Sequence, residues 1–329
     1  MLNKYIMLTL LISLSNFLCT SEKSAQQIYT KKRKADTQTA IITPVDQVVL
    51  TCALKVVDNI RNKKPHTSYY NSQRSRNLYD SSSTESFKLS RSKLKDFLNC
   101  QRCFFIDRKK GTGHVPGYPF SLNSAVDALL KKEFDEYRQK QEAHPYCIDN
   151  NINAIPFQHP LLESWRNSLY EGVQAQINGT NIVLTGGIDD LWINPTTNEL
   201  IVVDYKATSK KGDVSLDADW QDDYKQQIEI YQWLLRQQIG TNLDSQYTIS
   251  DTAYFVYCNG DAQAEQFSNR LNFKVSLLPY KGDCSWVEPA VIAAYHCLQS
   301  EKIPASSSSC DHCKRFQAVS NHLEKEKSI

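Results

Sequence analysis

Three residues in the middle of the chain could together hold a divalent metal ion: Asp189 in GGIDD, and Asp204 and Lys206 in VVDYK. Two carboxylates and the backbone carbonyl of Tyr205 would supply the oxygen ligands that Mg²⁺ or Mn²⁺ prefers. Such an ion polarises a phosphoryl oxygen and lowers the pKa of an attacking water, while a neighbouring ammonium stabilises negative charge in the transition state. The residue types therefore indicate hydrolysis of a phosphodiester.

A hairpin of two strands can bring these residues together. Residues 181–193 and 199–208 are rich in β-branched side chains, and the turn-forming segment NPTTN separates them. Alternation along the second strand places Asp204 and Lys206 on the same face, and Asp189 can converge on them from the neighbouring strand. Taken alone, an Asp-x-Lys at a strand end is more often a surface ion pair, so the neighbouring segments decide between the two interpretations.

The rest of the chain from residue 88 alternates between helical and strand patterns. The spacing predicts helices from Ser90, near Leu122, and over residues 160–177, 220–238 and 287–298, with further strands over 252–257 and 271–278. In the helix over 220–238, Gln227 and Tyr231 are four residues apart and so share a face. A hydrophobic content of 41% is ample for an α/β core.

The order of these segments resembles the RecB-like branch of the PD-(D/E)XK nucleases, which includes the RecB and AddB nuclease domains and CRISPR-associated exonucleases. GGIDDLWIN is similar to the acidic motif of that branch, LIVVDYKAT to its D-Y-K strand, and YKQQIEIYQWLL to its Q-x-x-x-Y helix. The resemblance implies an α/β fold with a restriction-endonuclease-like core over residues 87–317, in which helices flank a mixed central β-sheet.

The same resemblance implies a divalent-metal-dependent DNA nuclease, acting as an exo- or endonuclease in DNA repair, recombination or processing. The implied catalytic residues are Asp189, Asp204, Lys206, Gln227 and Tyr231, and the implied ligands of Mg²⁺ or Mn²⁺ include Asp189, Asp204 and Tyr205. Core packing is the alternative for Tyr231. The sequence contains no Walker motif, so a helicase or other repair protein would be a separate partner.

A third acidic ligand is harder to assign. RecB-like relatives usually carry a His or Glu on the helix before the hairpin, and the corresponding segment here reads SLNSAVD. Asp127 matches that position best as a metal ligand, and Glu133 is the second choice. The third ligand, and with it the number of metal ions, stays open.

Two C-x-x-C pairs, Cys100 with Cys103 and Cys310 with Cys313, have the spacing of metal ligands. Tight disulfides are the alternative. SRSKLKDFLNCQRCFF resembles the entry segment of RecB-like nucleases, in which one early and three late cysteines hold an iron-sulfur cluster. The four thiolates here, arranged two and two, suit either [4Fe-4S] or Zn²⁺ as a structural metal or cluster.

The net charge of +2 gives no global argument for a polyanionic partner, so contact with DNA must depend on a local patch. Candidate contacts to the DNA backbone are Lys131, Lys132, Lys210, Lys211, Arg108, Lys109 and Lys110. Trp220 is the best candidate for stacking on unpaired bases, because core burial fits Trp192, Tyr224 and Trp233 better.

The ends of the chain differ from this middle region. Residues 1–20 form an apolar, signal-like segment, 21–86 a mostly flexible polar extension that could hold one helix over 45–60, and 318–329 a polar tail. A cytoplasmic nuclease domain is favoured, without a stable membrane partner; retention of the apolar run over 5–18 would instead allow export or membrane tethering. Two alternatives remain, a catalytically silent scaffold of the same fold and an exported thiol-rich binding protein.

Overall fold

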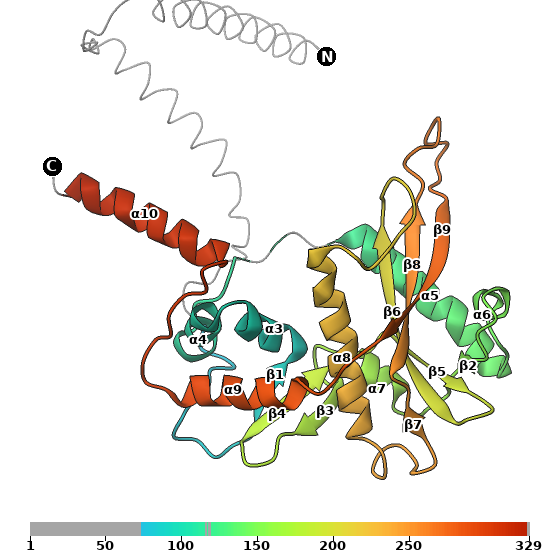
Figure 1. Cartoon of the computed structure of the whole chain (residues 1–329), viewed down its shortest axis with the longest axis horizontal. Coiled ribbons are helices and arrows are strands. Elements are labelled where there is room, and N and C mark those ends of the chain that lie inside the picture. The colour runs from blue at the N-terminus through green and yellow to red at the C-terminus, as the bar shows by residue number, and fades with distance from the viewer. Residues whose placement is uncertain (1–73, 116, 118–119, 328–329) are drawn as a thin grey trace, which may run out of the picture. The chain divides into compact units, whose positions relative to one another are not determined.

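The structure is a computed structural model that describes residues 74–115, 117 and 120–327. Its helices, labelled as in Figure 1, are α3 (Arg91–Asn99), α4 (Gln101–Lys110), α5 (Ser121–Lys140), α6 (Pro145–Asp149), α7 (Leu162–Arg166), the 3₁₀ helix η1 (Asp219–Gln221), α8 (Asp222–Arg236), α9 (Val287–Gln299) and α10 (Asp311–Lys327). The strands are β1 (Phe87–Ser90), β2 (Ile155–Pro156), β3 (Val173–Gln176), β4 (Ile182–Gly186), β5 (Asp190–Asn194), β6 (Glu199–Thr208), β7 (Thr248–Ile249), β8 (Thr252–Gly260) and β9 (Phe273–Lys281).

The described strands form two sheets. In the larger sheet the order is β2-β5-β6-β8-β9, with β7 paired to the start of β6. β6 is antiparallel to β5 and parallel to β8, so this sheet is mixed. The chain crosses from β6 to β8 through α8, the usual way to join two parallel strands. The smaller sheet has the order β1-β4-β3, with β1 parallel and β3 antiparallel to β4.

The two faces of β6 belong to two different cores. Leu200 and Val202 point into a core shared with α8, α9 and the smaller sheet, whereas Ile201 and Val203 point into a second core under α5. Figure 1 shows α8 and α5 on opposite sides of the larger sheet. The alternation predicted from the sequence is therefore present, and β6 is buried on both faces along most of its length.

Helix α8 owes its position to an unusually apolar face. Ile228, Leu234 and Leu235 have no exposed surface, and each such burial contributes about 1.5–3 kcal/mol. Gly186 at the end of β4 lets the helix come close, because a Cβ there would lie 2.8 Å from the ring of Tyr231. Close packing of α8 on β4 therefore requires glycine at this position, which accounts for one of the two glycines of GGIDD.

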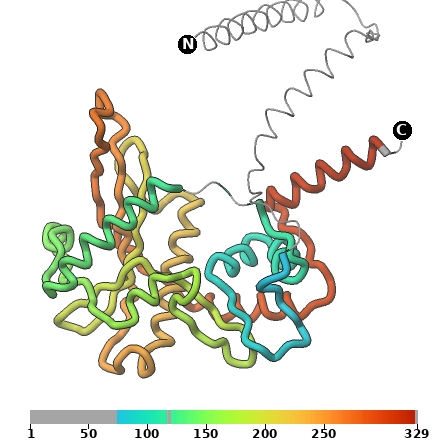
Figure 2. The backbone as a smooth tube through the Cα atoms, turned by 180° about the vertical axis from the view of Figure 1, so that it is seen from behind, coloured from blue at the N-terminus to red at the C-terminus, as the bar shows by residue number. Residues whose placement is uncertain are grey.

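The beginning and the end of the described unit lie side by side. Figures 1 and 2 show α9 next to α3 and α4, and both helices contact α9. Tyr79 is also buried here, accepting a hydrogen bond from Gln299 Nε2 at 2.6 Å and donating one to Asn181 Oδ1 at 3.0 Å. Residues before 87 thus contribute to the packed unit, earlier than the sequence analysis predicted.

Two local predictions were wrong. The helix expected over residues 160–177 is limited to α7, because the chain turns at Gly172, where φ is +72°, and then forms β3 against β4. The strand expected over 181–193 is divided into β4 and β5, which belong to different sheets. Both errors come from partners distant in sequence, which local patterns do not contain.

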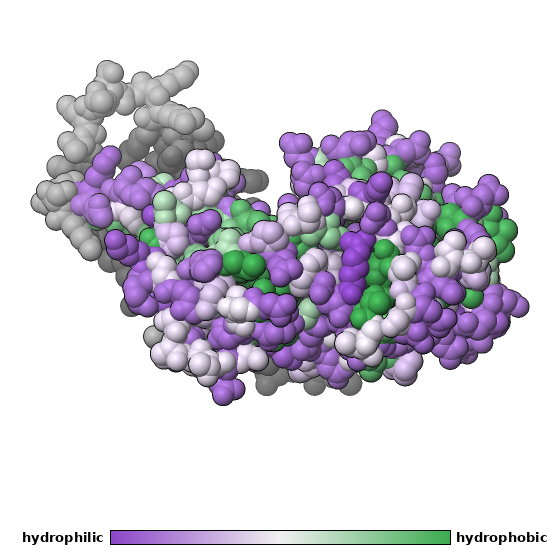
Figure 3. Space-filling model, turned by 60° about the horizontal axis from the view of Figure 1, so that its bottom comes forward, coloured by the Kyte–Doolittle hydropathy of each residue, from purple (hydrophilic) through white to green (hydrophobic). Residues whose placement is uncertain are grey.

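Some predictions concern segments that the structure does not describe, or describes only in part. The apolar segment over 1–20 and the helix expected over 45–60 fall outside the described residues. Residues 318–327 continue α10, whose side chains are mostly exposed. No helix within the described residues is long and apolar enough to cross a membrane. The face seen in Figure 3 is mostly hydrophilic, with hydrophobic side chains gathered in separate small areas.

Candidate active site

Asp204 and Lys206 lie near the end of β6 on the face covered by α8. Asp204 has no exposed surface, and its Oδ2 is ion-paired with Nζ of Lys206. Gln227 of α8 donates from Nε2 to Asp204 Oδ1 at 2.7 Å and to the Tyr231 hydroxyl at 3.1 Å. The structure therefore brings together four of the five residues predicted to be catalytic.

The fifth, Asp189, lies in the short loop between β4 and β5. Its Oδ2 accepts a hydrogen bond from the amide of Tyr205 at 3.0 Å, which fixes the carboxylate beside β6. The loop can take this course because residue 187 is glycine: a Cβ there would lie 2.4 Å from Cβ of Ser168. The second glycine of GGIDD is therefore required by the neighbouring backbone, and it places Asp189 next to Asp204.

Charge in this cluster is not fully compensated within the protein. Burial raises the pKa of Asp204 to about 7, and the charge of Asp189 adds to that rise, whereas Lys206 opposes it. Burial alone would lower the pKa of Lys206, but the charges of Asp204 and Asp189 outweigh it, and the pKa is raised. Three carboxylates, Asp127, Asp189 and Asp204, thus share two ammonium groups, those of Lys131 and Lys206. A buried carboxylate in this condition fits a site for a cation.

The two candidates for the third acid have different surroundings. Asp127 of α5 lies beside the cluster: Lys131 Nζ is 2.9 Å from Asp127 Oδ2 and 3.2 Å from Asp189 Oδ1. Glu133 instead contacts Nε2 of His144 at 3.1 Å. The structure therefore brings Asp127, and not Glu133, to the predicted site. Lys131, considered from the sequence only as a contact to DNA, bridges two carboxylates of the site.

An open cavity of about 290 Å³ lies against this cluster. Its lining includes Asp127, Lys206, Tyr224 and the exposed ring of Phe120. Lys206 Nζ lies 4.5 Å from the centroid of the Tyr224 ring, a cation–π contact that limits where the ammonium can move. The cavity gives a ligand access to the charged end of β6.

The aromatic residues considered from the sequence differ in how far they are buried. Trp192 and Trp233 are buried in the two cores, whereas Trp220 is 57% exposed and packs edge-on against Tyr224 at 5.4 Å between ring centroids. Trp220 and Tyr224 therefore form an aromatic pair of which one ring lines the cavity and the other faces solvent.

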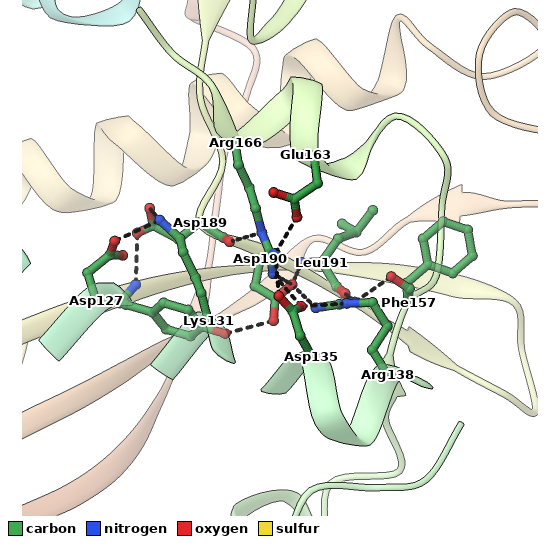
Figure 4. A network of polar contacts seen from close by, with 11 residues as sticks. Asp127, Lys131, Asp135, Arg138, Phe157, Glu163, Arg166, Asp189, Asp190 and Leu191 are labelled. Carbon is green, nitrogen blue, oxygen red and sulfur yellow. Dashed lines mark hydrogen bonds and ion pairs between the residues drawn. The ribbon is translucent and has the colours of Figure 1, made fainter. Parts of the chain in front are cut away.

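Asp190, the second acid of GGIDD, has a different environment from Asp189 and was missed in the sequence analysis. It is completely buried, and Figure 4 shows it between two guanidinium groups. Arg138 and Arg166 form ion pairs with its Oδ1, and the Leu191 amide donates to the same atom at 2.8 Å. The hydroxyl of Tyr205 donates to Oδ2 at 2.7 Å. This carboxylate thus has a partner for each oxygen.

The arginines extend this contact into a network that supports the active-site loop. Arg166 donates from Nε to the backbone carbonyl of Asp189 at 3.0 Å and pairs with both oxygens of Asp135, at 2.9 and 3.0 Å. Figure 4 shows these residues next to Lys131 and Asp127. The spacing of charges on α5, with Asp135 and Arg138 following Asp127 and Lys131, is the sequence signal that could have indicated it.

The four predicted cysteines also come together. Their sulfur atoms all lie within 4.8 Å of one another, with 3.6 Å from Cys103 to both Cys310 and Cys313, and 3.8 Å from Cys100 to Cys313. All eight described cysteines are free of disulfides. Burial would raise the pKa of Cys100, but hydrogen bonds from the backbone of Cys103 and Ser307 lower it to about 7. Burial raises the pKa of Cys103 and of Cys313, so Cys100 is the thiol of this group that ionises most readily, and the others would lose their protons to a bound metal.

Fold and site together define a class of protein: an α/β domain with a mixed sheet flanked by helices, with an acid and a lysine near the end of a central strand and a second acid beside them in the preceding loop. The sequence model of the PD-(D/E)XK nuclease superfamily matches residues 88–316. The chain belongs to this superfamily, and its architecture is the restriction-endonuclease-like fold. Members of the superfamily are usually nucleases, which supports a hydrolase.

Comparisons with individual proteins add little. The search of curated proteins gave no match. Among solved structures, the one titled "Crystal structure of SSO0001" aligns with 13% identity and a TM-score of 0.26, covering 78% of this chain and 89% of that chain. A likeness this low carries no argument about fold or function.

Proposed function

We propose that the chain is a divalent-metal-dependent deoxyribonuclease of the RecB-like branch. The observation that carries this proposal is the meeting of Asp189, Asp204 and Lys206 beside an open cavity, where burial and the charge of Asp189 raise the pKa of Asp204. A catalytically silent scaffold would not need a buried acid beside further carboxylates that outnumber the ammonium groups, because such crowding of negative charge destabilises the fold.

The residues present fit a hard divalent cation. Asp189 and Asp204 would hold it through their carboxylates, and the Tyr205 carbonyl lies on the same edge of β6 as the amide that contacts Asp189. When bound, Mg²⁺ or Mn²⁺ would polarise the phosphoryl group and lower the pKa of a water molecule. The all-oxygen donor set favours these ions over zinc.

The chain's own residues would carry out the remaining work. Lys206, restrained by the Tyr224 ring, would donate to the phosphate and stabilise its extra negative charge in the transition state. Gln227 holds Asp204 by its Oδ1, and Oδ2, which contacts Lys206, would be the oxygen that holds the metal. The Tyr205 amide orients Asp189 in the same way.

DNA is the proposed substrate, in repair, recombination or processing, and a helicase or other repair protein is a proposed partner. Trp220 and Phe120 are exposed near the cavity and could stack on unpaired bases as a strand enters it. Lys210 and Lys211, in the exposed segment after β6, could contact phosphates.

A cleavage assay on the full-length protein tests this proposal. Labelled single- and double-stranded DNA should be degraded with Mg²⁺ or Mn²⁺ and remain intact with EDTA. Asp204→Asn and Lys206→Ala should each reduce the rate by roughly a hundredfold or more, because one removes a metal ligand and the other a charge-stabilising donor. Both variants should keep the wild-type circular dichroism spectrum. Near wild-type rates in either would contradict the assignment.

We further propose that Cys100, Cys103, Cys310 and Cys313 bind a structural metal or cluster. Cys100 and Cys103 lie at the start of α4, and Cys310 and Cys313 at the start of α10, so the ligands come from both ends of the nuclease domain. A Zn–S length of about 2.3 Å gives sulfur–sulfur distances of about 3.8 Å in a tetrahedron, close to the spacing found. A [4Fe-4S] cluster would require the sulfurs to move apart, because each binds a different iron.

Metal analysis after anaerobic purification separates these outcomes. Zinc would leave the protein colourless, whereas an iron-sulfur cluster would give a brown protein. In either case Cys310→Ser should lower metal content and the melting temperature together, because a site that exists only when both ends are docked adds its binding free energy to folding. Cys297→Ser, on α9, is the matched control and should retain the metal. Full metal content in Cys310→Ser would exclude the site.

A further inference from the structure

Lys131 occupies an unusual position for a lysine in a nuclease site that is expected to bind cations. Its ammonium lies between two carboxylates, 2.9 Å from Asp127 Oδ2 and 3.2 Å from Asp189 Oδ1. The lysine side chain is only 23% exposed and extends from the well-packed part of α5, between Leu130 and the fully buried Phe134. Figure 4 shows Lys131 directed at Asp189 and Asp127.

The two oxygens of Asp189 have different partners as a result. Oδ2 faces β6, where it accepts from the Tyr205 amide beside Asp204, and Oδ1 faces α5, where it meets Lys131. A two-metal site would need both sides, because its ions lie about 3.5–4 Å apart and share a carboxylate. The second ion would have to use Asp127 and Asp189 Oδ1, the same atoms that Lys131 contacts. An ammonium in contact with both of these oxygens repels a divalent cation that would bind to them.

We propose that Lys131 takes the place of a second divalent ion, so that the acid site binds a single ion on the β6 side of Asp189. Asp127 then serves to hold Lys131 in place, and the lysine supplies one positive charge to the site without a metal. This inference rests on the proposed function, because it assumes that Asp189 and Asp204 bind a first ion. It also explains how Asp127 can lie at the site without being a metal ligand.

Counting bound Mn²⁺ tests the inference without reference to activity. Isothermal titration of full-length protein, with Asp204→Asn as the background for ions held elsewhere, should give one Mn²⁺ at the acid site of the wild type. Lys131→Met should bind two, and electron paramagnetic resonance should show the exchange-coupled signal of adjacent Mn²⁺ ions. Lys131→Arg keeps the charge and should bind one. If Lys131→Met does not fold, Lys131→Gln replaces it.

Two further variants define the position of the second ion. Lys132→Met removes the same charge from the adjacent, exposed position of α5 and should still bind one Mn²⁺. Adding Asp127→Asn to Lys131→Met should return the count from two to one. Two ions in the wild type, or one in Lys131→Met, would overturn the inference and leave the proposed function intact. No Mn²⁺ at the acid site of the wild type would overturn both.

Discussion

Two adjacent aspartates, Asp189 and Asp190, lie in regions of the molecule with opposite electrostatic character. At the site around Asp189 and Asp204, three carboxylates share the ammonium groups of Lys131 and Lys206, and burial together with the charge of Asp189 raises the pKa of Asp204. The network around Asp190 is fully partnered, with two arginines, a tyrosine hydroxyl and a backbone amide on one carboxylate.

The two regions therefore have different roles: the site around Asp189 and Asp204 is suited to bind a cation, and the network around Asp190 supports the backbone. A buried carboxylate close to other carboxylates destabilises the protein until a cation binds, so this excess of negative charge is converted into affinity for the cation. A buried carboxylate with all its partners fixes the surrounding backbone, and here that backbone includes the carbonyl of Asp189. The network is built on the opposite face of β6 from the site, because Tyr205 points away from Asp204.

The largest effect on folding is expected at Asp190. Asp190→Asn should lower the free energy of unfolding by roughly 3 kcal/mol or more, because it leaves Arg138 and Arg166 buried with less compensating charge. Asp189→Asn is the matched control one residue away, and it should change stability by less than about 1 kcal/mol, since its side chain is partly exposed. Urea unfolding of both variants measures the difference. Equal stabilities would mean that the two regions do not differ as described.

A smaller effect of opposite sign is expected at Asp204. Its pKa is about 7 in the folded protein and 3.8 in the reference state, so the folded protein binds the proton more tightly. The stabilising contribution of the protonated acid is complete below pH 3.8 and is lost as pH rises toward 7. Without added Mg²⁺ or Mn²⁺, Asp204→Asn should therefore gain stability over the wild type across this range.

Urea unfolding of wild type and Asp204→Asn from pH 4 to pH 8 measures that difference directly. Titration of other groups cancels in the comparison, because both proteins carry them. Adding Mn²⁺ at pH 8 should stabilise the wild type and leave Asp204→Asn unchanged. A difference that shrinks with rising pH would show that the charged form of Asp204 is not disfavoured in the folded protein, and would remove the contrast with Asp190.

The sequence predicted the site better than the network because of where the partners lie. Strand alternation places Asp204 with Lys206, and helical spacing places Gln227 with Tyr231, so local periodicity was sufficient for these pairs. Arg166 contacts Asp135, Asp189 and Asp190, and no local pattern joins them. The helix expected over residues 160–177 even assigned Arg166 to a continuous helix, whereas its position at the end of α7 comes from β3 pairing with β4.

The same reasoning applies to the fold. The hairpin of β5 and β6 and helices α5, α8 and α9 follow from periodicity and turn residues in the sequence. The division of β4 from β5 does not, because it depends on Ser168 approaching Gly187 and on Tyr231 packing against Gly186. The two glycines were visible in the sequence, but the residues that require them come from α8 and from the segment after α7.

The smallest expected effect distinguishes Asp127 from Glu133, the two candidates on α5 for the third acid of the site. Asp127→Ala would release Lys131, whose uncompensated ammonium would then act on Asp189 alone and weaken binding of the metal there. The Mn²⁺ concentration for half-maximal cleavage should rise roughly tenfold, as for other residues that act on a metal ligand. Glu133→Ala should leave it unchanged, because Glu133 contacts His144 and its side chain is half exposed. Titration of cleavage rate against Mn²⁺ measures both, with unfolding curves to confirm that neither variant has lost its structure. A larger rise in Glu133→Ala than in Asp127→Ala would move the third acid to Glu133 and extend the site along α5, away from the cavity.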